Sequence, residues 1–462
     1  MALPAPAPRA LRIFSGPAWW LLAFAVAVTT ARLTMESVQL GCTFALAVLT
    51  VGLYVRNRTA ALVVVWAVWL TAPFLRRIFL LSEPIQQAEP LALAPFLLTA
   101  IVVGLELTQI ELSERVRRLL LLAVAGYLVG LPFGLLLSPQ AALFAFFAYV
   151  AALGCFVIGY REAQERRLVL PTVLMIALPL LSLYAFRQYY LPLPEWDFVW
   201  QRSADINTVG SPESGRIRVW STLNSPGTFA TVLGASAIAL IAWGRITPLK
   251  VLGLLAVLGA LALTYVRSVW AGILFAVLAI AVASRGAALK RVVPVVAIVA
   301  ILMPVALGGS TRAALTERLT SFGSLGTDRS AQDRSAAPAK IVPRAVLAPL
   351  GRGLGSAGEA NRLSDRGGIR NTDNAYLSLL IQVGPVGFLV VMSAVAVSLA
   401  AAWRNVWRRP EDTDVLVFGM LAFFALLLFA GDQLYGIGGM IFWYMGGLAV
   451  RRRELRERRP AW

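Results

Sequence analysis

The sequence predicts an all-α, polytopic membrane protein that crosses the bilayer about fourteen times. Of its 462 residues, 58% are hydrophobic and only 14% are charged, whereas soluble domains average about 45–50% apolar and about 25% charged residues. The apolar residues are gathered into blocks of about 17–25 residues, and one such block spans a hydrocarbon core of about 30 Å as a helix. Basic residues mark alternate gaps between the blocks, which is the charge bias of a multi-span membrane protein.

The apolar blocks set the order of the predicted spans. The proline-rich amino terminus, MALPAPAPRALR, has no small-residue cleavage site after its apolar run, so we expect a retained span rather than a removed signal. The predicted spans are 15–31, 38–55, 60–75, 90–108, 119–137, 141–160, 169–186, 227–243, 249–266, 269–284, 292–308, 375–400, 414–431 and 433–450.

The basic gaps predict the orientation. If the number of spans is even, these gaps lie on the same side as both termini, and that side is expected to be the cytoplasm. The basic residues concerned are Arg9, Arg12, Arg56, Arg58, Arg115, Arg117, Arg118, Arg161, Arg166, Arg167, Arg245, Lys250, Arg285, Lys290, Arg291, Arg404, Arg408 and Arg409, with the carboxyl-terminal RRRELRERR. This topology accounts for the net charge of +18 without a nucleic-acid partner.

Two long segments then fall on the outer side. Residues 1–308 are predicted to hold eleven spans with an outer loop at 187–226, residues 309–374 a large outer loop, and residues 375–462 three spans and a basic cytoplasmic tail. Loops as long as 309–374 are usually functional or disordered. We expect this one to be functional because it shares its side with the arginines that the charge bias leaves unexplained.

These unexplained arginines lie at the outer ends of spans. Arg76 and Arg77 end the third span, Arg216 and Arg218 precede the eighth, and Arg267 lies between two apolar blocks with almost no loop. An arginine near hydrocarbon snorkels, pairs with an acid or lines a watery cavity. Snorkelling or pairing is the simpler interpretation at helix ends, but the flanks of Arg267 offer little polar cover. Several guanidinium groups on one side favour an anionic ligand, and phosphate suits their forked donors best.

The sequence also excludes some chemistry. It contains no histidine, so imidazole cannot act as base, nucleophile or metal ligand. Cys42 and Cys155 both lie in apolar blocks, so no disulfide framework is predicted. No P-loop or GxGxxG motif lies on the inner side, and the inner loops are too short for a nucleotide-sugar domain. We therefore expect no cofactor and no metal, and a donor that is already activated and reachable from the bilayer.

Four motifs follow one another between residues 210 and 390. They are RVWSTLNSPGTFA at 218–230, LTYVRSVWAG at 263–272, the segment 318–358 that ends in PLGRGLGSAG, and NTDNAYLSLLIQVGPVG at 371–387. In this order and topology they resemble the bacterial O-antigen ligase and O-antigen polymerase superfamily, which are polytopic glycosyltransferases of the GT-C type. The amino-terminal half resembles it only in topology and in the Arg76–Arg77 pair.

The first two motifs depart from the family pattern at three positions. The first is similar to Arg–x–x–Gly–Thr–Phe–x–Asn–Pro, with Ser221 in place of the glycine and Ser225 inserted before Pro226. The second is similar to Thr–x–Ser–Arg–(Gly/Ser)–x–Trp, with Arg267 on the arginine and Val266 where serine is usual.

The last two motifs carry the remaining candidate catalytic residues. Arg334 falls on the loop arginine that precedes the family's Pro–Leu–x–Gly–x–Gly. Asp373 stands where the fourth motif of the ligases has histidine, and Asn374 is retained. Because many polymerases of the superfamily carry aspartate there, the resemblance favours a polymerase over a ligase.

The resemblance implies transfer of an oligosaccharide from an undecaprenyl-pyrophosphate donor to a hydroxyl of a glycan acceptor. The reaction is expected to be inverting and metal-independent, at the outer face of the bacterial plasma (inner) membrane. Arg267 and Arg334 would stabilise the leaving diphosphate, because fixed cations aimed at developing charge supply a large catalytic term. Asp373 would accept the proton of the attacking hydroxyl, orient an arginine, or cap the following helix.

Other residues are predicted to bind the substrates, and other functions stay open. The predicted substrate-binding residues are Arg76, Arg77, Arg216, Arg218, Asn374, Tyr376 and Asp432, of which Asp432 would pair with an arginine and Tyr376 would stack on sugar or anchor at the interface. Membrane lipid, the glycan acceptor and a chain-length regulator are the expected partners.

A ligase is the first alternative. A lipid-linked glycan transporter is the second, although the sequence shows neither paired broken helices nor internal symmetry. A membrane scaffold would leave the outer arginines without a purpose.

Overall fold

A computed structural model describes residues 35–79, 90–165, 168–203, 209–211, 213–286, 339, 341–343, 345–364 and 374–458. Every predicted span within these residues coincides with a helix. The predicted spans 15–31 and 292–308 lie outside the described residues, as do Arg334 and Asp373.

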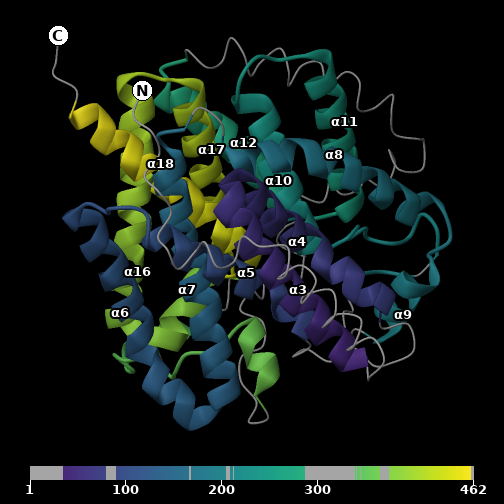
Figure 1. Ribbon diagram of the computed structural model, residues 1–462, viewed down its shortest axis with the longest axis horizontal. Coiled ribbons are helices and arrows are strands. Elements are labelled where there is room, and N and C mark those ends of the chain that lie inside the picture. The colour runs from purple at the N-terminus through teal and green to yellow at the C-terminus, as the bar shows by residue number, and fades with distance from the viewer. Residues whose placement is uncertain are drawn as a thin grey trace.

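The described part of the chain is helical, with no strand beyond one isolated bridge between Gly210 and Ile217. Its α-helices are Met35–Arg56 (α3), Arg58–Phe79 (α4), Pro90–Leu107 (α5), Glu114–Leu137 (α6), Pro139–Glu162 (α7), Val169–Tyr190 (α8), Glu195–Ser203 (α9), Pro226–Ala242 (α10), Pro248–Thr264 (α11), Arg267–Ala283 (α12), Ala375–Arg408 (α16), Asp412–Leu427 (α17) and Gly436–Glu457 (α18), and a 3₁₀ helix covers Glu359–Leu363 (η3). Figure 1 shows them packed as one bundle.

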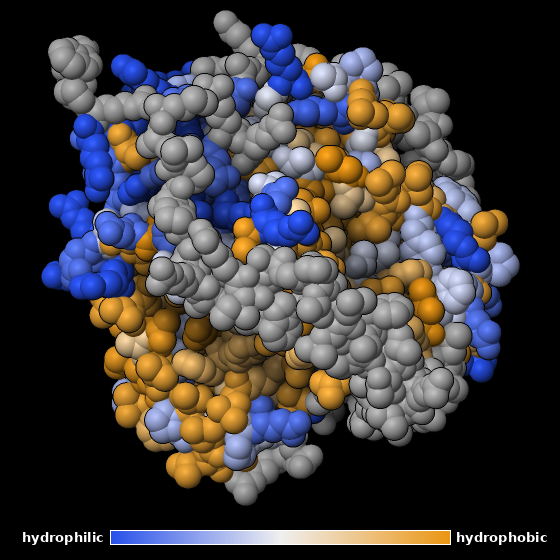
Figure 2. All heavy atoms as spheres, viewed as in Figure 1, coloured by the Kyte–Doolittle hydropathy of each residue, from blue (hydrophilic) through white to orange (hydrophobic). Residues whose placement is uncertain are grey.

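Several helices are built to cross a bilayer. Within the described residues, seven are long and apolar enough to do so, namely α3 to α8 and α16, and three shorter apolar helices are α10, α11 and α12. Leucines on α6 and α8 face outward, including Leu121, Leu136, Leu180 and Leu183. Figure 2 shows this apolar surface over α6, with hydrophilic residues gathered where α18 ends. The all-α polytopic membrane fold is thus confirmed.

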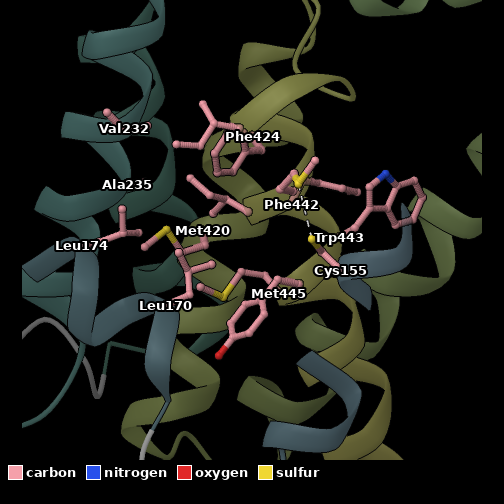
Figure 3. Close-up of a cluster of buried hydrophobic side chains, with 14 of the residues drawn as sticks. Cys155, Leu170, Leu174, Val232, Ala235, Met420, Phe424, Phe442, Trp443 and Met445 are labelled. Carbon is pink, nitrogen blue, oxygen red and sulfur yellow. Dashed lines mark hydrogen bonds between the residues drawn. The ribbon is translucent and has the colours of Figure 1, made fainter. Parts of the chain in front are cut away.

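The core is a tight contact of α7 and α18; α5 and α6 pack on α7, and α16 and α17 pack on α18. Phe424, Phe442 and Met445 fill its interior, and the Sγ atom of Cys155 lies 3.5 Å from the Sδ atom of Met440 (Figure 3). A side chain at Gly159 would collide with the Tyr444 carbonyl. Small residues allow this backbone approach, which van der Waals packing rewards inside a bilayer.

Helix α16 is broken in its first half. Gly384 has φ +66° and ψ 177°, and Pro385 follows it without an N–H group. The segment 349–353 replaces the missing helical bonds: the N–H groups of Arg352 and Gly353 donate to the carbonyls of Ile381 and Gln382 at 2.8 and 3.1 Å. In return the Val386 N–H donates to the Pro349 carbonyl at 3.4 Å. The third and fourth sequence motifs are therefore joined through their backbones.

Helix α6 packs beside both partners of this contact (Figure 1). Its Gly126, Gly130 and Gly134 recur every fourth residue and face α16 and the 349–353 segment. The Gly130 carbonyl also accepts from the Leu354 N–H at 2.8 Å. This small-residue stripe holds the break of α16 and the segment that repairs it in one place.

Replacement of Gly384 by alanine should destabilise the protein strongly. The added Cβ would collide with the Pro349 carbonyl and the Gly351 amide in a left-handed conformation, which costs at least about 2 kcal/mol. Thermal unfolding of the purified protein measures the loss. Gly104→Ala is the matched control, because nothing lies within 4 Å of its added Cβ. Equal melting temperatures of both variants would contradict the repaired break.

Candidate functional site

The predicted site residues that are described lie at the end of the bundle opposite the carboxyl-terminal arginines. Helix α18 begins at this end at Gly436 and finishes among Arg451, Arg452 and Arg453 at the other. Hydrogen bonds join other helix ends here: Arg77 near the end of α4 and Gln188 near the end of α8 both bond to Ser221. Arg218 bonds to Thr264 at the end of α11, and Ala375 at the start of α16 bonds to Leu428 after α17.

The first and second motifs meet at a corner, where residues 218–219 bond to residues 263–264. Helix α11 ends at Thr264, Tyr265 turns the chain with φ +54°, and Arg267 begins α12. The Arg218 Nε donates to the Thr264 carbonyl at 2.9 Å, and the Val219 N–H donates to the Leu263 carbonyl at 3.2 Å. The Arg218 guanidinium thus lies beside the turn that presents Arg267, and both arginines are partly buried.

The first motif makes a turn and then starts a helix. Ser221 has φ +51°. Glycine adopts this conformation without steric cost, whereas residues with a Cβ atom are strained in it. Ser225 then caps α10, since its hydroxyl accepts from the Thr228 N–H at 3.1 Å, and Pro226 occupies the first helical position. The serine inserted into the family pattern therefore acts as the helix cap.

The remaining predicted arginines at this end of the bundle have different surroundings. Arg77 is 2% exposed, and its Nη1 lies 2.7 Å from Asp197 Oδ1 of α9. Arg76 is also buried, with its guanidinium 5.6 Å from the centre of the Trp200 ring. Arg216 is exposed and pairs with Glu213 at 3.0 Å. The structure therefore places Arg218 beside the turn that precedes Arg267, while Arg77 points towards α9.

Asp432 lies in the connection between α17 and α18, among hydroxyl groups. Its Oδ2 accepts from the Tyr149 hydroxyl at 3.0 Å and from the Ser378 hydroxyl at 3.1 Å. Burial raises the pKa of the Asp432 carboxyl from 3.8 to about 6, although both hydroxyl bonds lower it and the nearby Glu359 raises it further. Besides these two hydroxyls, the backbone N–H of Leu434 also hydrogen-bonds to the Asp432 carboxylate.

Gln382 connects Asp432 to the glycine-rich segment. Its Nε2 donates to the Ser378 and Tyr149 oxygens at 3.0 and 3.3 Å, and its Oε1 accepts from the Gly355 N–H at 2.8 Å. A Cβ on Gly358 would lie 3.1 Å from Asp432 Oδ2. The residues 351–358 thus lie over the Asp432 carboxyl and contribute to its burial.

The start of α16 connects this cluster to the arginine corner. Asn374 caps the helix, accepting from the Leu377 N–H at 3.1 Å, and the Ala375 N–H donates to the Leu428 carbonyl at 2.8 Å. The Tyr376 hydroxyl donates to the Ala425 carbonyl at 3.2 Å. On the other side of α17, a Cβ on Gly272 would lie 3.5 Å from Leu427. The end of α17 therefore contacts both α12, which begins at Arg267, and α16, which carries Ser378 beside Asp432.

Sequence reasoning missed the residues that support this site. Ser378 and Gln382 are polar, four residues apart and buried in α16, so their spacing was a usable signal. Tyr149 lies in an apolar run of α7 with no such signal. In the described part of the chain, no group of three or more acidic or cysteine side chains is placed to hold a metal ion.

Disruption of the Gln382 connection should destabilise the protein. Gln382→Leu removes two side-chain donors and leaves the Gly355 N–H, the Tyr149 hydroxyl and the Ser378 hydroxyl short of a partner, at a cost of about 1–3 kcal/mol. Thermal unfolding tests this. Ser393→Ala on the exposed face of the same helix loses only a local bond to Val390 and should melt like the parent protein. A melting temperature of Gln382→Leu equal to that control would contradict the connection.

A comparison with known protein families matches part of the chain that forms this end of the bundle. Residues 252–392 match the family described as O-antigen ligase, a range that includes the second, third and fourth motifs and ends within α16. No curated protein and no solved structure matches the chain. The matched segment holds Arg267, the glycine-rich segment and the Ser378–Gln382 pair, which are the parts that meet at one end of the bundle. This match supports the resemblance of residues 252–392 to the O-antigen ligase and polymerase superfamily.

Proposed function

We propose that the protein transfers an oligosaccharide from an undecaprenyl-pyrophosphate donor to a hydroxyl group of a growing glycan, as a polymerase at the outer face of the bacterial plasma membrane. Both termini and the arginine tail lie in the cytoplasm in this proposal. The observation that carries it is the corner where the Arg218 guanidinium lies beside the turn that presents Arg267. Two cations at the outer end of membrane helices suit a diphosphate attached to a lipid in the bilayer.

The arginines act on the leaving group. The acceptor hydroxyl attacks the anomeric carbon, the bond from that carbon to the diphosphate oxygen breaks, and the configuration inverts. Negative charge then grows on the diphosphate, where Arg267, Arg218 and Arg334 stabilise it without a metal ion. Arg76 and Arg216 belong to the outer rim of the same site. Asn374 and Tyr376 line the entry to α16 next to it.

A carboxylate takes the proton that the acceptor hydroxyl loses. Asp432, at this end of the bundle, and Asp373, which lies outside the described residues, are the two candidates. The raised pKa of about 6 suits Asp432 to this role, because the group is ionised at neutral pH and still basic enough to accept a proton. In this scheme Asp373 orients an arginine of the 309–374 loop.

Loss of an arginine should abolish polymerisation. Arg267→Ala and Arg334→Ala are expected to reduce transfer by about 100-fold or more, since one fixed donor to developing charge contributes roughly 3 kcal/mol. Complementation of a deletion strain, with glycan chain length read on gels, measures this. Arg202→Ala, at an exposed residue that lies over the Phe198 ring, is the control. Full-length glycan from normally expressed Arg267→Ala or Arg334→Ala would contradict the diphosphate assignment.

Transfer should depend on the ionisation of Asp432. Activity is expected to rise as the pH increases through about 6, where the carboxyl loses its proton. Asp432→Asn should remove this rise, and Ser378→Ala should move it to higher pH, because the Ser378 hydroxyl bond lowers the pKa. Membranes of a deletion strain supply the native donor and acceptor to the purified protein for this assay. An unchanged pH profile in Asp432→Asn would assign the proton to another group.

A ligase is the second candidate, because the matched family carries that description. The deletion strain separates the two functions. Loss of a polymerase leaves single repeat units on the acceptor, whereas loss of a ligase leaves long chains on the lipid carrier. A regulator of chain length is a partner only of the polymerase.

A further inference from the structure

The turn that carries Arg218 contains a strained residue. Ser221 has φ +51° and is completely buried. An L-residue with a Cβ atom is disfavoured in this left-handed region, while glycine enters it freely. A serine stays there only if its surroundings hold it.

Every polar group of Ser221 is bonded to another element. Its N–H donates to Gln188 Oε1 at 2.7 Å, and its carbonyl accepts from Arg77 Nη2 at 2.6 Å. Its hydroxyl donates to the Leu181 carbonyl at 2.8 Å. The peptide groups on both sides of the strained residue are therefore held by α8 and α4.

The side chains that hold the turn also hold one another. Asp197 Oδ1 lies 2.7 Å from Arg77 Nη1, and its Oδ2 accepts from Gln188 Nε2 at 2.7 Å and from the Tyr184 hydroxyl at 2.7 Å. Arg77, Gln188 and Asp197 are all buried, so water does not compete for these bonds. We call these three residues the turn clamp.

The turn clamp influences where the preceding arginine, Arg218, lies. Ser221 is three residues after Arg218, and between them the Val219 N–H is bonded to the Leu263 carbonyl. Thr222 is fixed as well, since its hydroxyl donates to the Leu70 carbonyl of α4 at 2.6 Å. If Ser221 relaxed to a right-handed or extended conformation, the chain direction at residues 218–219 would change and Arg218 would leave the Thr264 carbonyl.

We propose that Arg77, Gln188 and Asp197 are positioning residues, which keep Ser221 in the left-handed conformation and so place Arg218 beside Arg267 for the diphosphate. This inference rests on the proposed function of the two arginines. It gives Arg77 a role through the turn instead of a contact with the substrate.

Substitutions at Ser221 separate conformation from hydrogen bonding. Ser221→Thr keeps a hydroxyl for the Leu181 carbonyl, but a β-branched residue strongly disfavours positive φ. Ser221→Gly loses the hydroxyl but favours the conformation. Affinity for inorganic pyrophosphate, measured by calorimetry on the full-length protein in lipid nanodiscs, is the readout. We expect at least about fivefold weaker binding in Ser221→Thr and unchanged binding in Ser221→Gly.

The clamp itself is tested by rescue. Gln188→Leu removes the bonds to Ser221 and Asp197 and should weaken pyrophosphate binding at least about tenfold, because a buried backbone N–H and the Asp197 carboxylate each lose a partner. Adding Ser221→Gly should restore most of the binding, since glycine needs no support in this turn. Ser236→Ala is the matched control, because its hydroxyl also donates to a carbonyl of α8, that of Leu174, at 2.9 Å.

The outcomes are distinct. Weak binding in Ser221→Gly with normal binding in Ser221→Thr would overturn the inference in favour of the hydroxyl bond. Failure of Ser221→Gly to rescue a folded Gln188→Leu would also overturn it, and the two Ser221 variants decide the question if Gln188→Leu does not fold. Arg218→Ala and Arg267→Ala test the proposed function separately. If neither weakens pyrophosphate binding, the diphosphate site is wrong; if both do and the clamp variants bind normally, only the clamp is wrong.

Discussion

The architecture depends on satisfying backbone polar groups where no water is available. A broken helix inside a bilayer exposes N–H and C=O groups whose cost is several kcal/mol each unless the protein supplies partners. At Gly384 those partners come from residues 349–353, far away in the sequence. The same contact brings the glycine-rich segment over Asp432 and fixes Gln382 at the centre of the site. One repaired break in α16 therefore organises an entire half of the site.

The other half depends on backbone direction rather than on a helix break. Two non-glycine residues with positive φ, Ser221 and Tyr265, turn the chain on either side of the contact between 218–219 and 263–264. These turns give two arginines of separate motifs a common position. In the proposed reaction, cations held by the backbone in this way would need little reorganisation when charge develops on the leaving group.

Residues of the same type serve different purposes within a short distance. Arg77 bonds to Asp197 and to the Ser221 carbonyl. Arg218 bonds instead to the Thr264 carbonyl, in the turn that precedes Arg267. At the opposite end of the bundle, Arg58 and Arg161 both bond to the buried Glu106. Buried charges of this kind are retained only with partners, and so an arginine at a span end has several structural uses besides ligand binding.

The sequence alone determined the membrane-spanning helices, because about twenty apolar residues between polar gaps allow no other structure in a bilayer. Helix limits from α3 to α8 follow from it closely. It also identified Arg218, Arg267 and Asp432 as candidates, because charged residues at the ends of apolar blocks are visible in any hydropathy pattern.

Only the tertiary structure decided the partners of these residues. Nothing in the sequence distinguishes Arg77 from Arg218, since the Asp197 that pairs with Arg77 lies 120 positions away. Tyr149, Ser378 and Gln382 became relevant when folding placed them around Asp432. Hydropathy is a local property that each segment carries by itself, whereas a hydrogen-bond network exists only where distant segments meet.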